Sequence, residues 1–424
     1  MTLPSAFHNE MGRGGIELMR RLTDDGHDAC FVGGCVRDAL LDRPVKDIDI
    51  ATSATPEQVI ALFPEAIPTG LQHGTVTVPN GKFHYEITTF RSEEDYTDGR
   101  HPGRVIFIPD IAGDLARRDF TVNAMALSAE GELIDPFGGV NDIKSGVLRA
   151  VGNAAERFQE DALRMLRCIR FAAEYGFQID RQTWEEVKLA APGLSRIAME
   201  RVRGELERMI DGADPYRAIV LMRESGLLRW CKDKLRLPES LGISVSGADD
   251  PLKEIGRLTN GAARWSFWFH RMMLSPEEAR FVCKALRHPN AFVEATDQTL
   301  RFHQSLSAAP SSSAREAWIT AVLQFGASAA GRWLEWCEAV ETRGEYSWTE
   351  TYRLHGKAWM EEAAVLSLKE LNVDGRMLTA ALDKKSGPWL KHLLNRLLRE
   401  AALGFVVNDE AALIQRAREI MEDN

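Results

Sequence analysis

The chain has 424 residues, of which 45% are hydrophobic and 27% are charged, and its formal net charge is −10 at pH 7. These values are those of an ordinary soluble protein with a large core and roughly two to four domains. The acidic balance argues against indiscriminate binding of nucleic acids, but it leaves room for a local basic groove. Arginines are concentrated between Arg149 and Arg223, where such a groove is expected.

Neither a membrane segment nor a disulfide framework is expected. The N-terminal segment has no apolar stretch of a signal peptide, and no later segment approaches the roughly 20 uninterrupted apolar residues of a membrane span. The six cysteines are scattered, mostly inside apolar stretches, without a CxxC pair or zinc-like spacing. We therefore predict a cytoplasmic protein with reduced core thiols and no membrane partner.

The first informative segment joins a short strand to a helix through two glycines. Residues 29–32 are apolar and predict a strand, and residues 36–41 predict the start of a helix. Gly33 and Gly34 lie between them, where the missing Cβ lets the backbone approach a bound group closely. Backbone N–H groups and a helix N-terminus at such a turn favour negative charge, which predicts a triphosphate site with Arg37 in reach.

Two carboxylates come soon after this turn in the pattern of a strand. Alternate residues of a strand point the same way, so we expect Asp47 and Asp49 to project side by side, with Ile48 in the core behind them. Two hard oxygen ligands placed in this way suit Mg2+. Glu86, on a later predicted strand, is a candidate third catalytic carboxylate, with a solvated strand residue as the equal alternative. Either motif alone is commonly structural, but the combination favours nucleotidyl transfer.

Two hairpins are expected in the first 150 residues. Residues 75–78 and 83–90 are strand-like and joined through Asn80-Gly81, two residues that tolerate positive φ. A second hairpin is expected over residues 123–135, turning at Glu130-Gly131.

A polar segment from Ser92 to Pro102 separates the carboxylate strands from an arginine-rich segment. Its composition is that of a surface loop. Its place between these two segments gives a second interpretation, a mobile element that changes the setting of a nucleotide pocket. We call this element the lever.

The arginine-rich segment places two guanidinium groups, Arg117 and Arg118, beside Asp119 and just before Asn123. Arginine can bind phosphate oxygens with two parallel hydrogen bonds, and aspartate and asparagine can bind ribose hydroxyls. A salt bridge at a helix end is the alternative interpretation.

A second polar pattern runs from Glu160 to Arg170. Steps of three place Asp161, Arg164, Arg167 and Arg170 in a slowly drifting stripe on a predicted helix. An aspartate can accept from the exocyclic amine of cytosine or adenine, and an arginine can donate to the neighbouring ring acceptors. An Asp/Arg pair could therefore imitate a template base, and a network of surface ion pairs is the alternative.

From Asn153 onward the pattern changes to helix after helix, which predicts a domain boundary there. Residues 308–313 and 384–388 are expected to interrupt the later helices. We predict an α+β protein in which a small mixed sheet precedes an all-helical remainder.

Several of these segments resemble motifs of one family. The glycine turn and carboxylates together resemble the DNA polymerase beta-like nucleotidyltransferases. The segments GGCVRD, DID, RRDFTVNAMA, DPFGG, EDALRMLRCIRF and ERVRGELERM are similar, in this order, to the motifs of bacterial class II CCA-adding enzymes, which are tRNA nucleotidyltransferases. The resemblance is dense over residues 28–210 and looser beyond.

The resemblance implies a catalytic head over residues 1–150, a neck over 151–225, a body over 226–325 and a tRNA-binding tail over 326–424, with the tRNA recognised by its acceptor and T arms. It implies addition of CCA to the tRNA 3′ end from CTP and ATP, with Mg2+ and release of pyrophosphate. The residues to which it gives binding roles are Gly34, Arg37, Asp47, Asp49, Arg118, Asp161, Arg164, Arg167 and Arg170. It gives no expectation for the oligomeric state.

Related activities are alternatives. Addition of A alone or of CC alone to tRNA, and poly(A) synthesis, belong to enzymes with the same head. A tRNA-binding protein without catalysis is a further alternative, but binding alone has no use for paired carboxylates near RNA phosphates. No histidine-aspartate pattern near the C-terminus predicts an appended phosphohydrolase.

Overall fold

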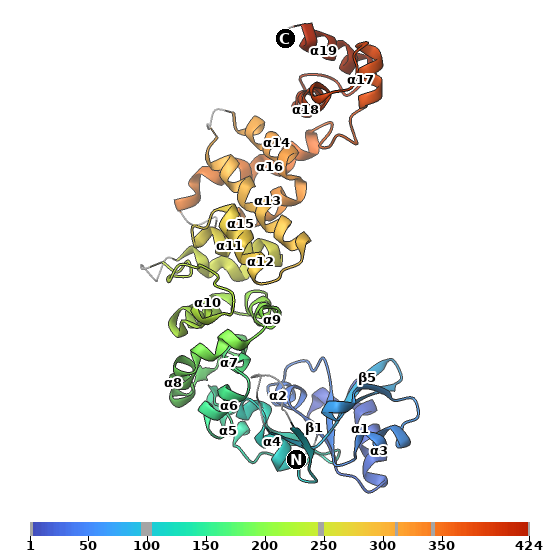
Figure 1. Cartoon of the computed structure of the whole chain (residues 1–424), viewed down its shortest axis with the longest axis vertical. Coiled ribbons are helices and arrows are strands. Elements are labelled where there is room, and N and C mark those ends of the chain that lie inside the picture. The colour runs from blue at the N-terminus through green and yellow to red at the C-terminus, as the bar shows by residue number, and fades with distance from the viewer. Residues whose placement is uncertain (1–2, 95–103, 245–249, 310–312, 341–343, 423–424) are drawn as a thin grey trace. The chain divides into compact units, whose positions relative to one another are not determined.

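A computed structural model describes residues 3–94, 104–244, 250–309, 313–340 and 344–422. The chain divides into two compact units, Met1–Lys234 and Leu235–Asn424, which Figure 1 colours from blue to green and from yellow to red. The predicted division into four parts, with boundaries after residues 150, 225 and 325, is finer than this division and stays a prediction.

A mixed sheet forms the centre of unit 1. Its strands, among the described residues, are β1 (Ala29–Val32), β2 (Asp49–Thr52), β3 (Ile67–Gly70), β4 (Thr75–Asn80), β5 (Phe83–Thr89), β8 (Ala126–Leu127) and β9 (Leu133–Ile134). They lie in the order β3-β4-β5-β2-β1-β8-β9. Strands β2 and β5 run parallel, and their neighbours in the sheet pair antiparallel. With the helices that come after it in the chain, this sheet confirms the predicted α+β class.

Short helices and two strand pairs complete the head of unit 1. The helices are η1 (Ser5–Phe7), α1 (Glu10–Asp24), α2 (Gly34–Leu40), α3 (Pro56–Leu62), η2 (Leu71–His73), α4 (Ile111–Ala116), η3 (Thr121–Asn123) and α5 (Gly139–Ser145). Strand β6 (Arg91–Glu94) pairs antiparallel with β7 (Arg104–Phe107), and β10 (Val147–Leu148) pairs parallel with β11 (Gln178–Ile179). Most of the segment predicted as a lever, residues 95–102 of it, lies outside the described part of the chain.

Strand β1 is covered on both faces, which explains its continuous apolar sequence. In β1, Phe31 packs into a cluster with α1, while Cys30 and Val32 pack into a second cluster on the other face. In β2, Ile50 and Ala51 divide in the same way between the two clusters. Side chains of a strand alternate between its faces, so burial on both sides requires an unbroken apolar run.

Both predicted hairpins are present, the second in shortened form. Strands β4 and β5 pair from Asn80 and Phe83 outward, and Gly81 has a φ of 61°. Strands β8 and β9 pair around a turn in which Gly131 has a φ of 85°. The first strand of this hairpin is predicted from Asn123, but residues 121–123 form η3 instead, because Asn123 and Ala124 close turns onto the carbonyls of Phe120 and Thr121.

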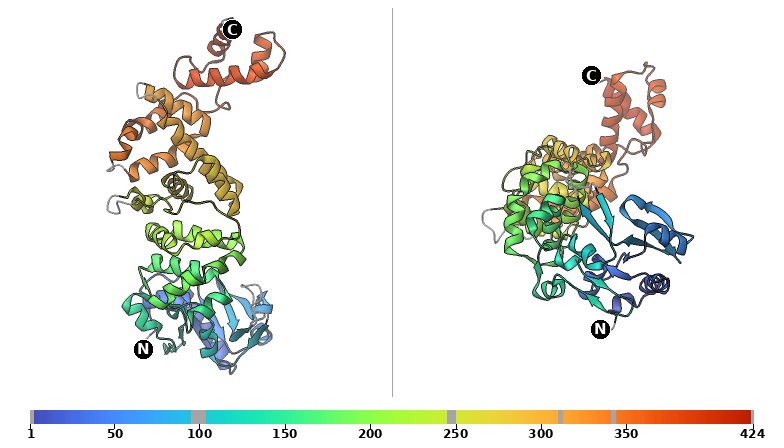
Figure 2. Two further views of the ribbon diagram at one scale, coloured as in Figure 1. Left: turned by 60° about the vertical axis from the view of Figure 1, so that its left-hand side comes forward. Right: turned by 60° about the horizontal axis from the view of Figure 1, so that its bottom comes forward.

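The rest of unit 1, whose helices are called the neck helices below, is mainly helical, as predicted from Asn153 onward. It comprises α6 (Ala154–Glu160), α7 (Leu163–Tyr175), α8 (Arg181–Leu189), η4 (Ala191–Arg196), α9 (Met199–Ile210), α10 (Pro215–Ser225) and η5 (Leu227–Trp230). Helix α7 packs against α9 and α10, and Figure 2 shows these green helices from two further sides. The predicted apolar stripe of Leu163, Leu166 and Ile169 is buried.

Unit 2 consists of helices within its described residues. They are η6 (Pro251–Arg257), α11 (Gly261–Arg271), α12 (Pro276–Ala285), α13 (Asn290–Ser307), α14 (Ala314–Phe325), α15 (Ala327–Ala339), η8 (Gly344–Thr349), α16 (Glu350–Glu362), α17 (Gly375–Ala381), α18 (Pro388–Ala402) and α19 (Glu410–Glu422). The predicted interruptions at residues 308–313 and 384–388 fall between α13 and α14 and at the start of α18. In the described ranges no helix is long and apolar enough to cross a membrane. The six cysteines are buried and unpaired with one another, as predicted.

Two histidines lie inside the aromatic core of unit 2. The rings of His270, on α11, and His303, on α13, are 4.3 Å apart, and both lie within 6 Å of the Trp336 ring. Trp333 donates a hydrogen bond of 3.0 Å to Nδ1 of His303. Burial lowers the pKa of His270 to about 4, with Arg271 adding to the effect. Burial and the neighbouring His270 lower the pKa of His303 to about 3.

We predict that acidification destabilises unit 2 through these histidines. In the unfolded chain they take up a proton near pH 6.5, whereas the folded chain excludes it until about pH 4. The free energy of unfolding should therefore fall below pH 6.5 by up to about 1.4 kcal/mol per pH unit for each histidine. Tryptophan fluorescence during urea unfolding measures this, because most of the tryptophans lie in unit 2.

His303→Gln removes one titrating group and keeps an acceptor for Trp333. It should reduce the number of protons taken up on unfolding by about one between pH 6.5 and 4, and so lower the slope of the free energy of unfolding against pH. The control is His392→Gln, at an exposed position of α18. An unchanged pH dependence in His303→Gln would contradict the prediction.

Candidate active site

Strand register brings the predicted catalytic groups together on the central strands β5, β2 and β1, toward the end at which β1 stops and β2 begins. This end of the central strands is called the sheet edge below. The antiparallel pairing of β1 and β2 sets Phe31 opposite Ile50, so Asp49 lies beside the end of β1, where the chain turns at Gly33. The parallel pairing of β2 and β5 sets Asp49 opposite Glu86. The glycine turn and two of the predicted carboxylates thus lie side by side on three adjacent strands.

The glycine turn is shaped by two arginines that lie against it. Gly33 has a φ of 74°, which side chains disfavour, and a Cβ there would lie 2.7 Å from Nη1 of Arg118. The Cβ position of Gly34 is 3.5 Å from Nη2 of Arg37. Only glycine at position 33 allows Arg118 to approach the turn this closely.

Asp47 and Asp49 differ in their surroundings more than the sequence pattern predicted. Strand β2 begins at Asp49, so Asp47 precedes the strand, although Ile48 is buried between the two exposed aspartates as expected. Asp49 lines a cavity, and this enclosure raises its pKa; the carboxylates of Glu86 and Asp47 raise it further, and Arg118 opposes them.

This electrostatic arrangement is suited to a cation. A carboxylate whose pKa is raised by neighbouring carboxylates, as that of Asp49 is, is stabilised in its charged form when a positive ion lies among them. Over the described ranges, no group of three or more histidine, cysteine, aspartate or glutamate side chains is placed to hold a metal ion. The pair Asp47 and Asp49 therefore remains the candidate, and Glu86 as a third member stays a prediction without support from the side-chain positions.

A cavity of about 550 Å3 joins the sheet edge to the neck helices. Seven arginines line it against three aspartates, counting only residues that the structure describes. The lining residues are Gly33, Gly34, Arg37, Asp49, Arg117, Arg118, Asp119, Asn123, Asp161, Leu163, Arg164, Arg167, Arg170, Phe171 and Arg201. The local basic groove expected from the sequence thus exists within a chain of net negative charge, and it suits a polyanion such as a triphosphate.

Asp161 does not lie on a helix, contrary to the prediction. Helix α6 ends at Glu160 and α7 begins at Leu163, and Asp161 between them has an extended backbone. Its carboxylate accepts from the backbone N–H of Leu163 at 3.0 Å and from both Nη atoms of Arg201, at 2.7 and 3.3 Å. Its hydrogen bond to Leu163 closes the turn before α7, and the extended backbone of Asp161 separates it from the arginines of the predicted stripe.

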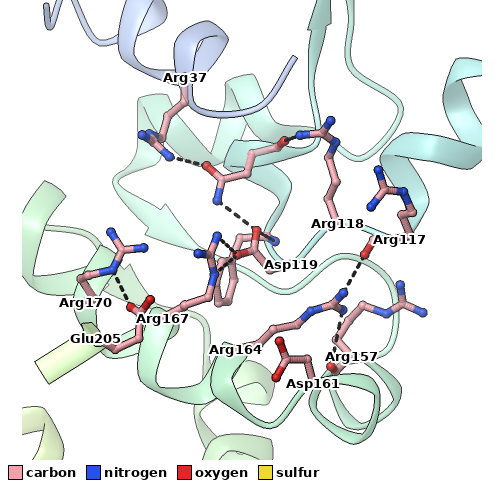
Figure 3. Close-up of polar contacts among 12 residues, drawn as sticks. Arg37, Arg117, Arg118, Asp119, Arg157, Asp161, Arg164, Arg167, Arg170 and Glu205 are labelled. Carbon is pink, nitrogen blue, oxygen red and sulfur yellow. Dashed lines mark hydrogen bonds and ion pairs between the residues drawn. The ribbon is translucent and has the colours of Figure 1, made fainter. Parts of the chain in front are cut away.

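Arg164 comes directly after Leu163 on α7 and lines the same cavity as Asp161; Figure 3 shows its side chain reaching toward Arg117. Its Nη1 donates to Glu160 at 2.7 Å, and its Nη2 donates to the carbonyl of Arg117 at 2.9 Å. The side chains of the four stripe residues bind to other segments or to residues outside the stripe. A simple surface network of i,i+3 pairs therefore does not describe them.

Asp119 is a buried residue whose carboxylate connects the head to helix α7. Its side chain, 8% exposed, accepts from Arg167 at 2.8 Å, from Asn123 at 3.0 Å and from the backbone N–H of Phe120 at 2.9 Å (Figure 3). Burial opposes the charge, but Arg167 and these hydrogen bonds prevail and lower the pKa of Asp119 to about 2. Both oxygens are engaged, which leaves Asp119 little capacity for the ribose contact predicted for it.

Asn123 and Arg170 are engaged in a similar way. Asn123 accepts from Nη1 of Arg37 while its amide donates to Asp119. Arg170 is 9% exposed, donates to Glu205 at 2.7 Å and pairs with Glu174 at 3.0 Å. The contact of Arg170 with Glu205 holds α7 against α9, and the contacts of Asn123 connect Arg37 to Asp119 within the head.

Three residues with a part in the site were not singled out from the sequence. Arg201 holds Asp161, Glu205 holds Arg170, and the buried Asp114 accepts from both Arg117 and Arg118. Arg201 and Glu205 lie in the segment ERVRGELERM, which carried part of the resemblance. Nothing in a single sequence relates Arg201 to Asp161, which lies 40 residues away.

Family models match most of the chain. Residues 29–149 match the model described as the poly(A) polymerase head domain, residues 176–232 a probable RNA- and SrmB-binding site of polymerase A, and residues 257–417 a putative domain 2 of tRNA nucleotidyltransferases. Together with the mixed sheet, the glycine turn and the carboxylates at its edge, these matches define a nucleotidyltransferase.

Similar proteins of known name specify the family. The chain is 38% identical to the CCA-adding enzyme of Geobacillus sp. strain WCH70 over 93% of both chains, and 33% identical to that of Limosilactobacillus reuteri over 96% of both. The crystal structure of the Bacillus stearothermophilus CCA-adding enzyme in complex with CTP is 32% identical, with a TM-score of 0.79, over 98% of this chain and 100% of that one. The chain belongs to the CCA-adding enzyme family, whose members generally use a divalent metal ion.

A structure of the Thermotoga maritima CCA-adding enzyme complexed with tRNA has the same fold. Its TM-score is 0.67 at 19% identity, over 99% of both chains.

We predict that Arg167→Met destabilises unit 1 by about 3 kcal/mol. It leaves the buried charge of Asp119 without its strongest partner, which typically costs about 3–5 kcal/mol, and the lower end applies because the Arg167 side chain is 31% exposed. Urea unfolding followed by circular dichroism at pH 7 measures the change. Arg181→Met is the control, because Arg181 pairs with Glu185 at an exposed surface and should change stability by less than about 0.5 kcal/mol.

The pH dependence gives a second test of the same pair. Asp119 has a lower pKa in the folded than in the unfolded chain, so its stabilisation is complete above about pH 4 and is lost as the pH falls toward 2. Arg167→Met should remove most of this dependence. Equal losses in Arg167→Met and Arg181→Met would show that the buried pair has no special weight.

Proposed function

We propose that this protein adds cytidine, cytidine and adenosine to the 3′ end of tRNA, using CTP and ATP without a nucleic-acid template and releasing pyrophosphate. The observation that carries the proposal is the cavity, which joins a glycine turn and an acidic sheet edge to an arginine-lined neck. Similarity to CCA-adding enzymes over 93% or more of the chain supports it. The four-part division into head, neck, body and tail, with the tail on the tRNA, belongs to the same proposal, as does action in the cytoplasm.

The triphosphate is proposed to lie at the glycine turn. Gly33 and Gly34 let the backbone approach the phosphates, and Arg37 and Arg118 lie against the turn on its cavity side. Arginine donors in a fixed orientation hold phosphate oxygens with little loss of side-chain entropy.

Asp47 and Asp49 are proposed to hold Mg2+. When bound, the metal would lower the pKa of the primer 3′-hydroxyl and neutralise charge on the α-phosphate. Glu86 lies beside Asp49 through the pairing of β2 and β5, where its charge adds to the attraction for a cation. Among the described neighbours that act on Asp49, Arg118 is the one whose charge lowers the pKa of this carboxylate.

Asp161 and Arg164 are proposed to select the base. Arg201 orients the Asp161 carboxylate, and Oδ2 of Asp161, which accepts from Arg201 alone among the described residues, retains a lone pair for an exocyclic amine. Arg164 is oriented by Glu160 and by the carbonyl of Arg117. Such preset donors and acceptors discriminate between bases without a template strand.

Asp119, Asn123, Arg167 and Arg170 are proposed to position these groups. Their hydrogen bonds run from α7 through the buried carboxylate of Asp119 to Arg37 in the head. A shift of α7 would therefore move Arg164 and Arg37 together relative to the sheet. This role replaces direct ribose binding by Asp119 and Asn123 as the one that the geometry favours.

One experiment separates complete CCA addition from its alternatives. The purified protein is incubated with tRNAs that end before the CCA, after C or after CC, and with each nucleotide separately. The proposal requires CTP incorporation on the first two substrates and ATP incorporation on the third. Extension by A alone, by CC alone, or by a long run of A would identify an A-adding enzyme, a CC-adding enzyme or a poly(A) polymerase.

We predict that Asp47→Ala and Asp49→Ala each abolish incorporation while tRNA binding changes by less than about twofold. The carboxylates serve the chemistry, and most of the RNA is expected to contact other surfaces. Incorporation within about tenfold of the wild type, a loss below ~1.4 kcal/mol in transition-state stabilisation, would refute the metal assignment. Glu57→Ala, at an exposed position of α3, is the matched control and should leave both properties intact.

We predict that Asp161→Ala and Arg164→Ala relax the choice among CTP, ATP, UTP and GTP more than they slow addition. Removing one paired donor or acceptor reduces discrimination by about 1–3 kcal/mol. Ratios of kcat/KM for the four nucleotides measure this, with Gln159→Ala, exposed on α6, as the control. Uniform slowing with fidelity retained would assign the two residues a structural role only.

A further inference from the structure

Tyr175 lies where the neck meets the head, at the last residue of α7. Its hydroxyl donates a hydrogen bond of 3.1 Å to Asp38 on α2. The guanidinium groups of Arg37 and Arg43 lie over its ring, 4.4 and 4.5 Å from the centroid. One neck side chain thus contacts three charged residues of the head.

Arg37 is the contact that matters for nucleotide binding, because it lines the cavity beside Gly34. Asp38 accepts from its Nε at 2.9 Å and from its Nη2 at 3.1 Å, and Asn123 accepts from its Nη1. These three bonds use three of the five N–H groups of the guanidinium. Within the described part of the chain the remaining two have no acceptor, and they can bind phosphate oxygens when the plane of the group is fixed.

The ring of Tyr175 restrains the orientation of the Arg37 guanidinium, which lies over its face. A cation over an aromatic face is attracted by the electron density of the ring, and Phe171, one turn earlier on α7, contributes a weaker contact at 5.2 Å. Asp38 binds both Arg37 and the Tyr175 hydroxyl, so the ring and its shared acceptor hold the guanidinium together. Burial raises the pKa of Tyr175, which keeps its hydroxyl protonated as a donor.

Arg43 connects the same ring to the chain after α2. Its Nη1 donates to the backbone carbonyl of Glu174 at 3.2 Å, at the C-terminal end of α7, where a cation is favourable. Tyr175 therefore contacts two arginines, whose guanidinium groups both lie over its ring. Removing its ring would leave Arg37 with Asp38, Asn123 and the weaker contact to Phe171.

We propose that Tyr175 is a positioning residue for the triphosphate, acting through the guanidinium of Arg37. The role rests on the proposed function, in which Arg37 binds phosphate oxygens. It concerns the phosphate end of the nucleotide, so it should affect CTP and ATP alike and leave the choice of base to Asp161 and Arg164.

The test measures binding of two ligands to the full-length protein in Mg2+. CTP carries both a base and a triphosphate, whereas inorganic tripolyphosphate carries only the phosphate end. Tyr175→Leu should weaken binding of both by the same factor, about three- to thirtyfold, the range of a cation–aromatic contact. Tyr175→Phe keeps the ring and should weaken binding by less than about threefold. Ratios of kcat/KM among the four nucleotides should not change in either variant.

Trp184→Leu is the matched control. Trp184 is a half-buried aromatic residue of α8 with Lys188 over its ring at 4.9 Å, so the substitution removes a similar contact in the same neck without touching Arg37. It should leave binding of both ligands unchanged. If Tyr175→Leu does not fold, as judged by thermal melting, Tyr175→Met takes its place with the same expected result.

The outcomes are distinct. A folded leucine or methionine variant that binds tripolyphosphate as the wild type does overturns the role of Tyr175, and so does a variant that loses affinity for CTP alone. A wild-type protein that neither binds CTP nor extends tRNA overturns the proposed function and this role with it. If the wild type extends tRNA and the Tyr175 variant binds both ligands as the wild type does, only the role of Tyr175 is overturned and the proposed function stands.

Discussion

The buried charge of Asp119 is the constraint on which the geometry of the site depends. A carboxylate that is 8% exposed must be paired or it destabilises the fold, and its partners come from both sides of the cavity. Asn123 and the N–H of Phe120 belong to the head, and Arg167 belongs to α7. The position of α7 over the sheet edge is therefore set by an electrostatic requirement as well as by apolar packing.

The features that the sequence predicts well are local. The hairpin at Asn80-Gly81 results from the need for positive φ at a tight turn, and the strand over residues 29–32 results from burial on both faces. The glycine turn at Gly33 and the alternation around Ile48 are likewise consequences of backbone geometry within a few residues. These features place the cavity at the correct edge of the sheet before any tertiary contact is known.

The sequence does not predict which charges meet. The ion pairs and hydrogen bonds from Asp161 to Arg201, from Arg167 to Asp119 and from Arg37 to Asn123 join residues 40, 48 and 86 positions apart. Regular spacing indicated a helical stripe, whereas these residues bind to other segments. The periodic pattern does not predict the break at Asp161, whose carboxylate binds the N–H of Leu163 and the side chain of Arg201 on another helix.

The surplus of arginine around the cavity has a consequence at long range. Because the chain as a whole is acidic, the surface outside the cavity carries more negative charge than the total indicates. An approaching nucleoside triphosphate is attracted toward this local positive charge and away from the negative charge elsewhere. Added salt screens repulsion and attraction together, with a decay length of about 8 Å at physiological ionic strength. Orientation of the incoming nucleotide thus begins in solution, before any side chain touches it.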